Sequence, residues 1–343
     1  MKNPYSINFG MLPRNLIERT LDTEEVIENF SADDPGCKLY MISGIRGSGK
    51  TVTMTEIENY FKKDKNWIVI DLNPELDLLE SLTAELSNHP STVQLLKDAK
   101  INLSLLGLGI EIDGIPPVTS ISAALDQILE RISKQGKRIL ITIDEVTNNK
   151  NVRVFSSQFQ IFLRKNYPVF MIMTGLYENI YNLQNEKTLT FLYRAPKIKM
   201  KPLNLRRISM NYQKVFGISE EEAYEMAKLT KGYPYAFQLL GYVCARSGRK
   251  YTEMIDEFDL YMSEYVYDKI WSELTPTDRK TILAICQSPD GKASHIRQQS
   301  GQTSNQYNKY RSRLIDKELI QTSDYGYVEF TLPRFREYVL AKR

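Results

Sequence analysis

The sequence contains few of the residues that build metal sites, disulfide frameworks and histidine-based catalytic triads. Its 343 residues include only two histidines, His89 and His295, and three cysteines, Cys37, Cys244 and Cys286. The cysteines are odd in number, far apart and without CxxC spacing, so neither a disulfide framework nor a zinc site is expected. With so little histidine, a Ser-His-Asp triad is not expected either. We interpret the cysteines as reduced core thiols.

Long hydrophobic runs are also missing. No run approaches the roughly 20 residues that a membrane-spanning helix needs, and the first residues do not show the pattern of a secretory signal. We therefore expect a cytoplasmic protein with no membrane partner. The composition is 42% hydrophobic and 25% charged, which is typical of an ordinary globular protein, and the length suits two or three domains.

A glycine-rich segment stands between an apolar run and a helical pattern. Residues 44–51 read G-I-R-G-S-G-K-T and match the pattern G-x-x-x-x-G-K-[ST]. The glycines let the backbone turn sharply with its N–H groups facing inward, at the positive end of the following helix. Lys50 would contact the β- and γ-phosphates, and the Thr51 hydroxyl would bind Mg²⁺. A glycine-rich turn of another α/β protein would not require Lys and Thr at these positions.

This pattern predicts that ATP or ADP is the cofactor, together with Mg²⁺. The predicted phosphate-binding residues are Gly44, Ile45, Arg46, Gly47, Ser48, Gly49, Lys50, Thr51 and Val52.

Two later apolar runs end in polar residues that suit hydrolysis. Residues 138–146 carry Asp144 and Glu145 at their end. In P-loop proteins the first acid holds Mg²⁺ and the second can polarise the attacking water. An acidic pair at a strand end is commonplace by itself, but together with the P-loop it indicates hydrolysis. Residues 168–175 end in Thr174, whose hydroxyl could reach the γ-phosphate or its water, or could simply end a strand.

The order of these runs indicates an α/β fold. Apolar runs at 38–44, 67–72, 138–146 and 168–175 are typical of parallel strands covered by helices on both faces. From about Leu205 the pattern is helical only, with Ser219 expected to cap one helix and Thr275 another. We predict a P-loop core over 1–204 with a β-hairpin insertion at about 101–117, a helical lid over 205–271, and a winged helix-turn-helix over 272–343.

The last segment carries the positive charge of the chain. From Leu274 onward it has twelve Lys and Arg against seven Asp and Glu, a net charge of +5. Three helical segments and a hairpin around Tyr325-Gly326 follow one another in the order of a winged helix. The third helix presents short polar and cationic side chains, which suit base edges and phosphates of double-stranded DNA. The predicted DNA contacts are Asn305, Lys309, Arg311 and Arg313.

Two other interpretations of this helix stay open. Winged helices also dock proteins, and Asp316 and Glu318 dilute the positive face. The helix could also be a solvated surface.

The P-loop, the strand ending in Asp-Glu, the polar end of the next strand and the helical lid resemble the AAA+ and STAND branch of ATPases. More narrowly, the chain is similar to prokaryotic ATPases related to the replication-initiator and origin-recognition group. The resemblance implies a nucleotide-driven switch that is often built as an oligomer. Its function would be to bind and hydrolyse ATP and to couple the nucleotide state to DNA binding or assembly. The alternative is a STAND-like signalling ATPase whose winged helix docks proteins, and a small-molecule kinase is a distant third.

The resemblance also implies roles for residues outside the first motifs. Arg194, in F-L-Y-R-A-P-K-I, would act on the γ-phosphate of a neighbouring subunit, although a surface arginine is an equal alternative. The segment K-G-Y-P-Y, at 231–235, stands where initiator-type ATPases place an arginine and resembles a G-x-P motif, so Pro234 would contact the nucleotide. Its alternative is a helix that starts with proline. Pro13 and Arg14 occupy the place of adenine contacts.

Overall fold

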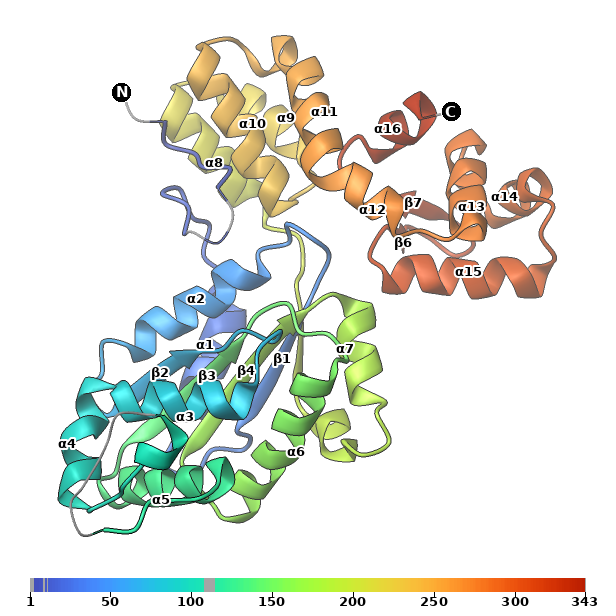
Figure 1. Ribbon diagram of the computed structural model, residues 1–343. Helices are drawn as coiled ribbons and strands as arrows, with labels where there is room; N and C mark the ends of the chain where they lie inside the picture. The colour runs from blue at the N-terminus through green and yellow to red at the C-terminus, as the bar shows by residue number, and fades with distance from the viewer. Residues whose placement is uncertain (1–2, 9, 11, 108–114, 343) are drawn as a thin grey trace. The chain divides into compact units, whose positions relative to one another are not determined.

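The computed structural model describes residues 3–8, 10, 12–107 and 115–342, and the chain divides into two compact units (Figure 1). The first, here called the sheet unit, comprises Thr20–Ser43 and Lys50–Lys199. The second, here called the helical unit, comprises Met1–Arg19, Gly44–Gly49 and Met200–Arg343. The chain passes between the units on both sides of the glycine-rich segment, so Gly44–Gly49 belong to the helical unit, whereas the flanking Ser43 and Lys50 belong to the sheet unit.

The sheet unit is built on a parallel five-stranded sheet with the order β2-β3-β4-β1-β5. The strands are β1 (Leu39–Ser43), β2 (Trp67–Asp71), β3 (Arg138–Ile143), β4 (Val169–Gly175) and β5 (Lys197–Lys199). The helices are α1 (Thr20–Ser31), α2 (Lys50–Phe61), α3 (Leu78–Asn88), α4 (Pro90–Asp98), α5 (Ile121–Lys134), α6 (Lys150–Arg164) and α7 (Tyr177–Gln184), with short 3₁₀ turns at Ser104–Leu106 and Thr190–Arg194.

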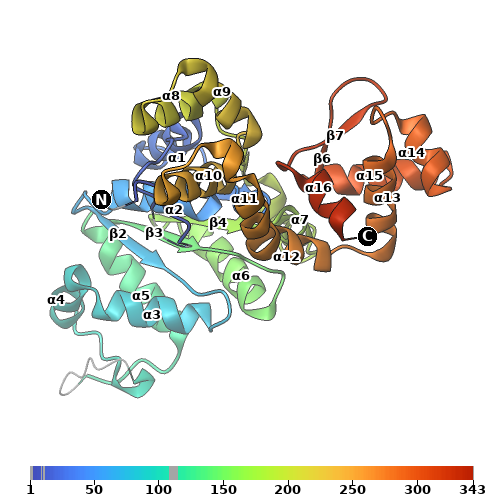
Figure 2. The ribbon, with the colours of Figure 1, turned by 90° about the horizontal axis from the view of Figure 1, so that it is seen from above.

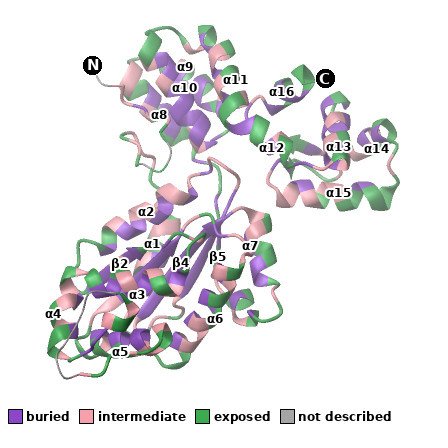
Figure 3. Ribbon diagram, viewed as in Figure 1, coloured by how far each residue is buried: buried purple, intermediate pink, exposed green. Residues whose placement is uncertain are grey.

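Both faces of the sheet are covered, and the alternation of side chains along each strand shows how. Met41 of β1 and Met171 of β4 pack in one hydrophobic cluster with apolar residues of α3, α5, α6 and α7. Tyr40 and Phe170, their neighbours in sequence, contact Phe30 of α1. Figures 1 and 2 show α1 and α2 on one side of the sheet and α3, α5 and α6 on the other. Burial on both faces explains the continuous apolar runs of the sequence, and the central strands are buried along their length (Figure 3).

The helical unit holds the remaining elements. They are α8 (Leu205–Phe216), α9 (Glu220–Leu229), α10 (Pro234–Ser247), a 3₁₀ turn (Tyr251–Glu253), α11 (Ile255–Met262), a π-helical turn (Ser263–Tyr267), α12 (Asp268–Ser272), α13 (Pro276–Gln287), α14 (Ala293–Ser300), α15 (Ser304–Asp316), β6 (Ile320–Thr322), β7 (Val328–Phe330) and α16 (Phe335–Ala341). Strands β6 and β7 pair antiparallel. We call residues 200–272 the lid and 273–342 the C-terminal module.

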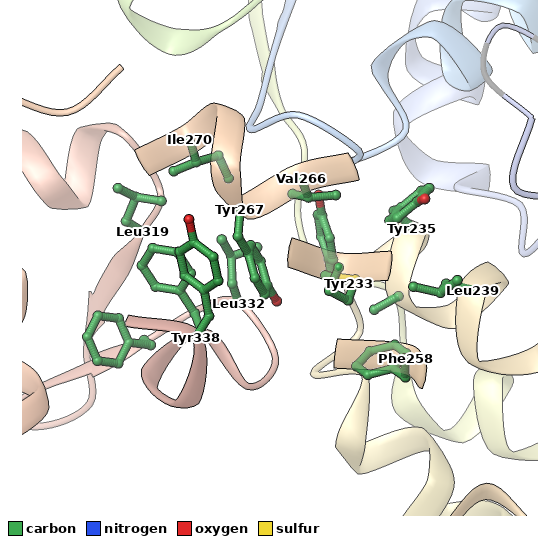
Figure 4. Packing of buried hydrophobic residues seen from close by; sticks show 14 of the residues in the cluster. Tyr233, Tyr235, Leu239, Phe258, Val266, Tyr267, Ile270, Leu319, Leu332 and Tyr338 are labelled. Atoms are coloured by element: carbon green, nitrogen blue, oxygen red, sulfur yellow. The ribbon is translucent and has the colours of Figure 1, made fainter. Parts of the chain in front are cut away.

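One hydrophobic cluster runs through the lid and the C-terminal module. Figure 4 shows Tyr267 and Ile270, which precede the module, beside Leu319 and Tyr338 of the module itself. Polar contacts reinforce this packing. Arg334 donates two hydrogen bonds of 2.6 Å to the Asp259 carboxylate, and Lys231 Nζ donates one of 2.6 Å to the Phe330 carbonyl.

The structure confirms the predicted α/β fold class and its four principal strands. Ser219 caps α9 by accepting from the Glu222 amide at 3.1 Å, and Thr275 forms a capping box with Asp278. The predicted β-hairpin insertion at 101–117 falls partly on residues 108–114, which lie outside the described residues. Its described flank contains the 3₁₀ turn Ser104–Leu106. No helix in the described part of the chain is both long and apolar enough to cross a membrane.

Candidate functional site

The carboxyl end of β3 carries a hydrogen-bond network in the sheet unit. Asp144 Oδ2 accepts from the Thr51 hydroxyl at 2.7 Å, and Asp144 Oδ1 accepts from the Thr174 hydroxyl. Strands β3 and β4 are adjacent and pair Ile143 with Met173, which brings Asp144 and Thr174 to the same sheet edge. Thr51 lies in the first turn of α2. The hydroxyls of two residues from separate parts of the sequence therefore meet on the carboxylate of a third, as expected for neighbouring parallel strands and the helix that follows the glycine-rich segment.

Glu145 has a left-handed backbone conformation, with φ of +51°. Its amide donates to Asp144 Oδ1 at 3.0 Å and to Thr174 Oγ1 at 3.3 Å, and the residue is exposed. Residues other than glycine seldom adopt this conformation, and such strain often occurs at functional sites. The Asp144 carboxylate and the Thr174 hydroxyl, which accept these two hydrogen bonds, hold the Glu145 amide in place.

A second acidic pair lies near this network. Asp71, at the end of β2, accepts a hydrogen bond of 3.2 Å from the Thr142 hydroxyl. Partial burial, together with the nearby Glu58 and Asp144 carboxylates, raises the pKa of Asp71 above its usual value. Glu58 is buried on α2 and pairs with Lys62 at 2.8 Å. The negative charges at this sheet edge therefore disfavour one another, and a bound cation would relieve them.

The backbone of the glycine-rich segment, residues 44–49, turns through two glycines with positive φ. Gly47 and Gly49 have φ of +73° and +91°, a region that glycine enters without a steric cost. At Gly44 an added Cβ would lie 2.5 Å from Ser48 Oγ and 2.9 Å from Met200 Cβ. The buried Ser48 Oγ has no hydrogen-bond partner among the described residues. A buried hydroxyl without a partner inside a glycine-lined turn fits an anion with acceptor oxygens.

The lid contacts this turn through the predicted G-x-P segment. The Tyr233 hydroxyl donates to the Arg46 carbonyl, and the Tyr235 amide donates to the Gly47 carbonyl at 3.2 Å. An added Cβ at Gly47 would lie 2.9 Å from Tyr235 Cβ, so the close approach requires glycine there. Burial raises the pKa of Tyr233, so its hydroxyl remains a donor at physiological pH. Pro234, the first residue of α10, comes within 4.0 Å of a Cβ built on Gly49.

The N-terminal segment also lies in the helical unit. The Asn15 carbonyl accepts from Gln238 Nε2 of α10 at 2.6 Å, which places the adjacent Pro13 and Arg14 near the lid. Arg19 Nη2 donates to the Ser48 carbonyl at 3.1 Å. Pro13 is half-buried and Arg14 is exposed. Arg19 is a contact of the glycine-rich segment that sequence analysis missed, because an arginine at the end of an irregular segment has no distinguishing pattern.

The remaining predicted residues lie on other elements of the two units. Arg194 is exposed at the end of the 3₁₀ turn before β5. On α15, Asn305 and Lys309 are exposed, whereas Arg311 donates to Thr322 Oγ1 of β6 at 2.7 Å. Arg313 lies 3.5 Å from a carboxylate oxygen of Asp278.

Asp278 is fully buried in α13. A buried carboxylate requires a partner, so the Arg313 guanidinium stabilises the module as well as being available to a ligand.

The residues present fit a magnesium-bound nucleotide. Thr51 and Asp144 supply oxygen ligands, which Mg²⁺ prefers. Among the described residues no group of three His, Cys, Asp or Glu could hold a metal ion, so the other ligands would be phosphate oxygens and water. Lys50 is buried at the start of α2 and follows Gly49 in the chain.

Comparison with solved structures shows which fold this is. A Walker-type ATPase of Pyrococcus abyssi superposes with a TM-score of 0.65 at 16% identity, covering 95% of this chain and 96% of that one. The ORC2 protein of Aeropyrum pernix, solved as ADPNP–ADP complexes, superposes with a TM-score of 0.62 at 11% identity, covering 98% and 95%. The chain has the fold of AAA+ P-loop ATPases.

At these identities the similarity establishes the fold alone. Residues 264–339 also match a family described only as a domain of unknown function (DUF8462). No curated protein matches the chain.

Proposed function

We propose that the chain binds magnesium-ATP through residues 44–51 and hydrolyses it. The observation that carries the proposal is the convergence of Thr51, Asp144 and Thr174 at the end of β3, directly after a glycine-lined turn. Loop amides and Lys50 bind the phosphates, and Thr51 and Asp144 hold the metal ion. Glu145 accepts a proton from the attacking water. Thr174 orients Asp144 and the Glu145 backbone.

Nucleotide binding is tested by isothermal titration calorimetry with magnesium-ATP and magnesium-ADP. The Lys50→Ala variant is expected to lose binding, because Lys50 supplies the charge on the phosphates. Lys134→Ala is the control, since Lys134 is an exposed lysine of α5 that pairs with Glu130. Absence of a binding heat for the wild-type protein with adenine and guanine nucleotides would refute the proposal.

Hydrolysis is tested separately by phosphate release. Glu145→Gln is expected to retain ATP binding and to lower turnover by about 10²-fold or more, the usual contribution of a general base. Glu130→Gln, on the exposed face of α5, is the control and should leave turnover unchanged. Equal turnover in the wild-type protein and Glu145→Gln would remove this residue from the mechanism.

We further propose that the C-terminal module is a winged helix that binds double-stranded DNA, with α15 in the major groove. Supporting this are the exposed Asn305 and Lys309 on one helix face and the net charge of +5 from Leu274 onward. Lys309→Ala should weaken binding to duplex DNA and reduce the salt slope by about one unit. Arg313→Ala is expected to lower stability instead, because it leaves Asp278 without its cation. An unchanged affinity in Lys309→Ala would favour the protein-docking alternative.

The exposed position of Arg194 suits a role across a subunit interface. If the ATP state assembles, light scattering should show a larger mass with a non-hydrolysable ATP analogue than with ADP. Arg194→Ala should then retain nucleotide binding and lose turnover. A monomer in both nucleotide states would exclude this role.

A further inference from the structure

Two carboxylates contact the beginning of the glycine-rich turn. Glu318 Oε2 accepts a hydrogen bond of 3.1 Å from the Ile45 amide, and Glu273 Oε1 pairs with Arg46 Nη2 at 2.9 Å. Lys269 also approaches Glu273, at 3.4 Å. Both glutamates are in the C-terminal module, more than 220 residues along the chain from the turn. All these residues belong to the helical unit.

The backbone of Glu318 is held in an unusual conformation. Its φ is +59°, just after α15, at a position where glycine or asparagine usually ends a helix. The Glu318 amide donates to the Ile315 carbonyl at 2.9 Å, and the Thr331 hydroxyl donates to the Glu318 carbonyl. A left-handed glutamate costs about 1 kcal/mol or more relative to glycine, and with this backbone conformation its carboxylate contacts the Ile45 amide.

Packing fixes where that side chain can reach. Leu319, the next residue, is buried in the cluster that joins the lid and the module. In Figure 4 it lies near Ile270. Ile45 packs at the edge of the same cluster. The buried Leu319 therefore anchors the backbone that carries Glu318, and the Glu318 carboxylate contacts the Ile45 amide from this anchored position.

We propose that Glu318 is a positioning residue for the phosphate-binding turn and that its charge lowers the affinity of the turn for nucleotide phosphates. This inference rests on the nucleotide binding proposed above. A carboxylate accepts hydrogen bonds from loop amides as a phosphate oxygen does. The same negative charge opposes the arrival of a polyphosphate. The C-terminal module therefore weakens nucleotide binding while it is docked, and by linkage nucleotide weakens the contact between the module and the turn.

A neutral replacement of Glu318 separates the effect of its charge from the effect of its packing. Glu318→Gln keeps the size and an acceptor oxygen, and it is expected to tighten the binding of magnesium-ADP by about fivefold or more in calorimetry. The tightening should shrink as salt is raised, because screening reduces the charge effect. Glu329→Gln is the matched control, since Glu329 is exposed on β7 and bonds to Gln321. Equal affinities of wild type and Glu318→Gln would overturn the charge effect.

A second measurement requires no nucleotide. Hydrogen exchange followed by mass spectrometry on a peptide spanning residues 44–49 should be faster in Glu318→Ala than in the wild-type protein, because the Ile45 amide loses its acceptor. Glu329→Ala should match the wild type. Unchanged exchange in Glu318→Ala would overturn the positioning role even if the protein binds no nucleotide. If the wild-type protein binds no nucleotide, the proposed function is refuted, and the hydrogen-exchange measurement still decides whether Glu318 positions the turn.

Discussion

Thr174 offers a direct test of the network at the end of β3. Its buried hydroxyl donates to the Asp144 carboxylate and accepts from the Glu145 amide at 3.3 Å. Replacement by valine removes both bonds while nearly conserving volume. A hydrogen bond to a charged group contributes about 1.5–3 kcal/mol, so we expect Thr174→Val to lower the free energy of unfolding by about 2 kcal/mol. Turnover should fall by about tenfold or more, because Asp144 and Glu145 lose a common support.

Thr174→Ser is the matched variant, since it keeps the hydroxyl and loses one buried methyl group. Its expected cost is about 1 kcal/mol, with turnover close to that of the wild type. The comparison therefore separates the hydrogen bonds from simple loss of packing.

The two tryptophans make the stability assay specific to one unit. Trp67 lies in β2 of the sheet unit and Trp271 in α12 of the helical unit. In a Trp271→Phe background, fluorescence during urea unfolding reports on the sheet unit alone. With a slope of about 2 kcal/mol per molar urea, the valine variant should shift the midpoint by about 1 M. Equal midpoints and equal turnover for the valine and serine variants would refute the reasoning.

Two further predictions concern packing and charge. Gly241→Ala should destabilise the helical unit by about 1 kcal/mol, because a Cβ there would lie 2.6 Å from the Tyr5 ring. The cost of this overpacking exceeds the gain of about 1 kcal/mol in helix propensity. In a Tyr5→Ala background the substitution should instead stabilise the unit, and Trp271 fluorescence during unfolding measures both effects. Asp71→Asn should stabilise the sheet unit at pH 7 by less than about 1 kcal/mol, since solvent screens this carboxyl. The pKa of Asp71 is raised in the folded state. The folded protein is therefore most stable, with respect to this group, below pH ~4, where Asp71 is protonated, and it loses this part of its free energy of unfolding as the pH rises. The stability that Asp71→Asn gains over the wild type should therefore vanish at pH ~3.5, as thermal unfolding can measure. A gain that is the same at both pH values would contradict this prediction.

The sequence predicted the site where its chemistry is local. Gly44 to Thr51 is a continuous motif, and Asp144 follows an apolar run long enough to identify a buried strand. The strand order was not predictable, because it depends on which apolar runs pair. It is nevertheless the order that places β3 beside β4 and brings Thr174 to Asp144.

Contacts between segments far apart in the chain could not be predicted from the sequence. Glu318 was interpreted as a residue that dilutes a positive helix face, but its carboxylate accepts from the Ile45 amide. Arg313 was interpreted as a DNA contact, and it lies beside the buried Asp278. Neither partnership leaves a periodic or compositional signal, because each joins single residues across a tertiary contact. The winged helix and the DNA contacts stay predictions.

The shared core of the lid and the C-terminal module limits which motion nucleotide could drive. Separating them would expose Tyr267, Leu319 and Tyr338, and each large apolar side chain costs about 1.5–3 kcal/mol to expose. It would also break the paired hydrogen bonds between Arg334 and Asp259. A ligand can shift an equilibrium only by its difference in affinity for the two states. A switch that kept this contact intact would therefore need less binding energy, so we expect the lid and the module to respond to nucleotide as one body, with the contact between Glu318 and the turn as the part that changes.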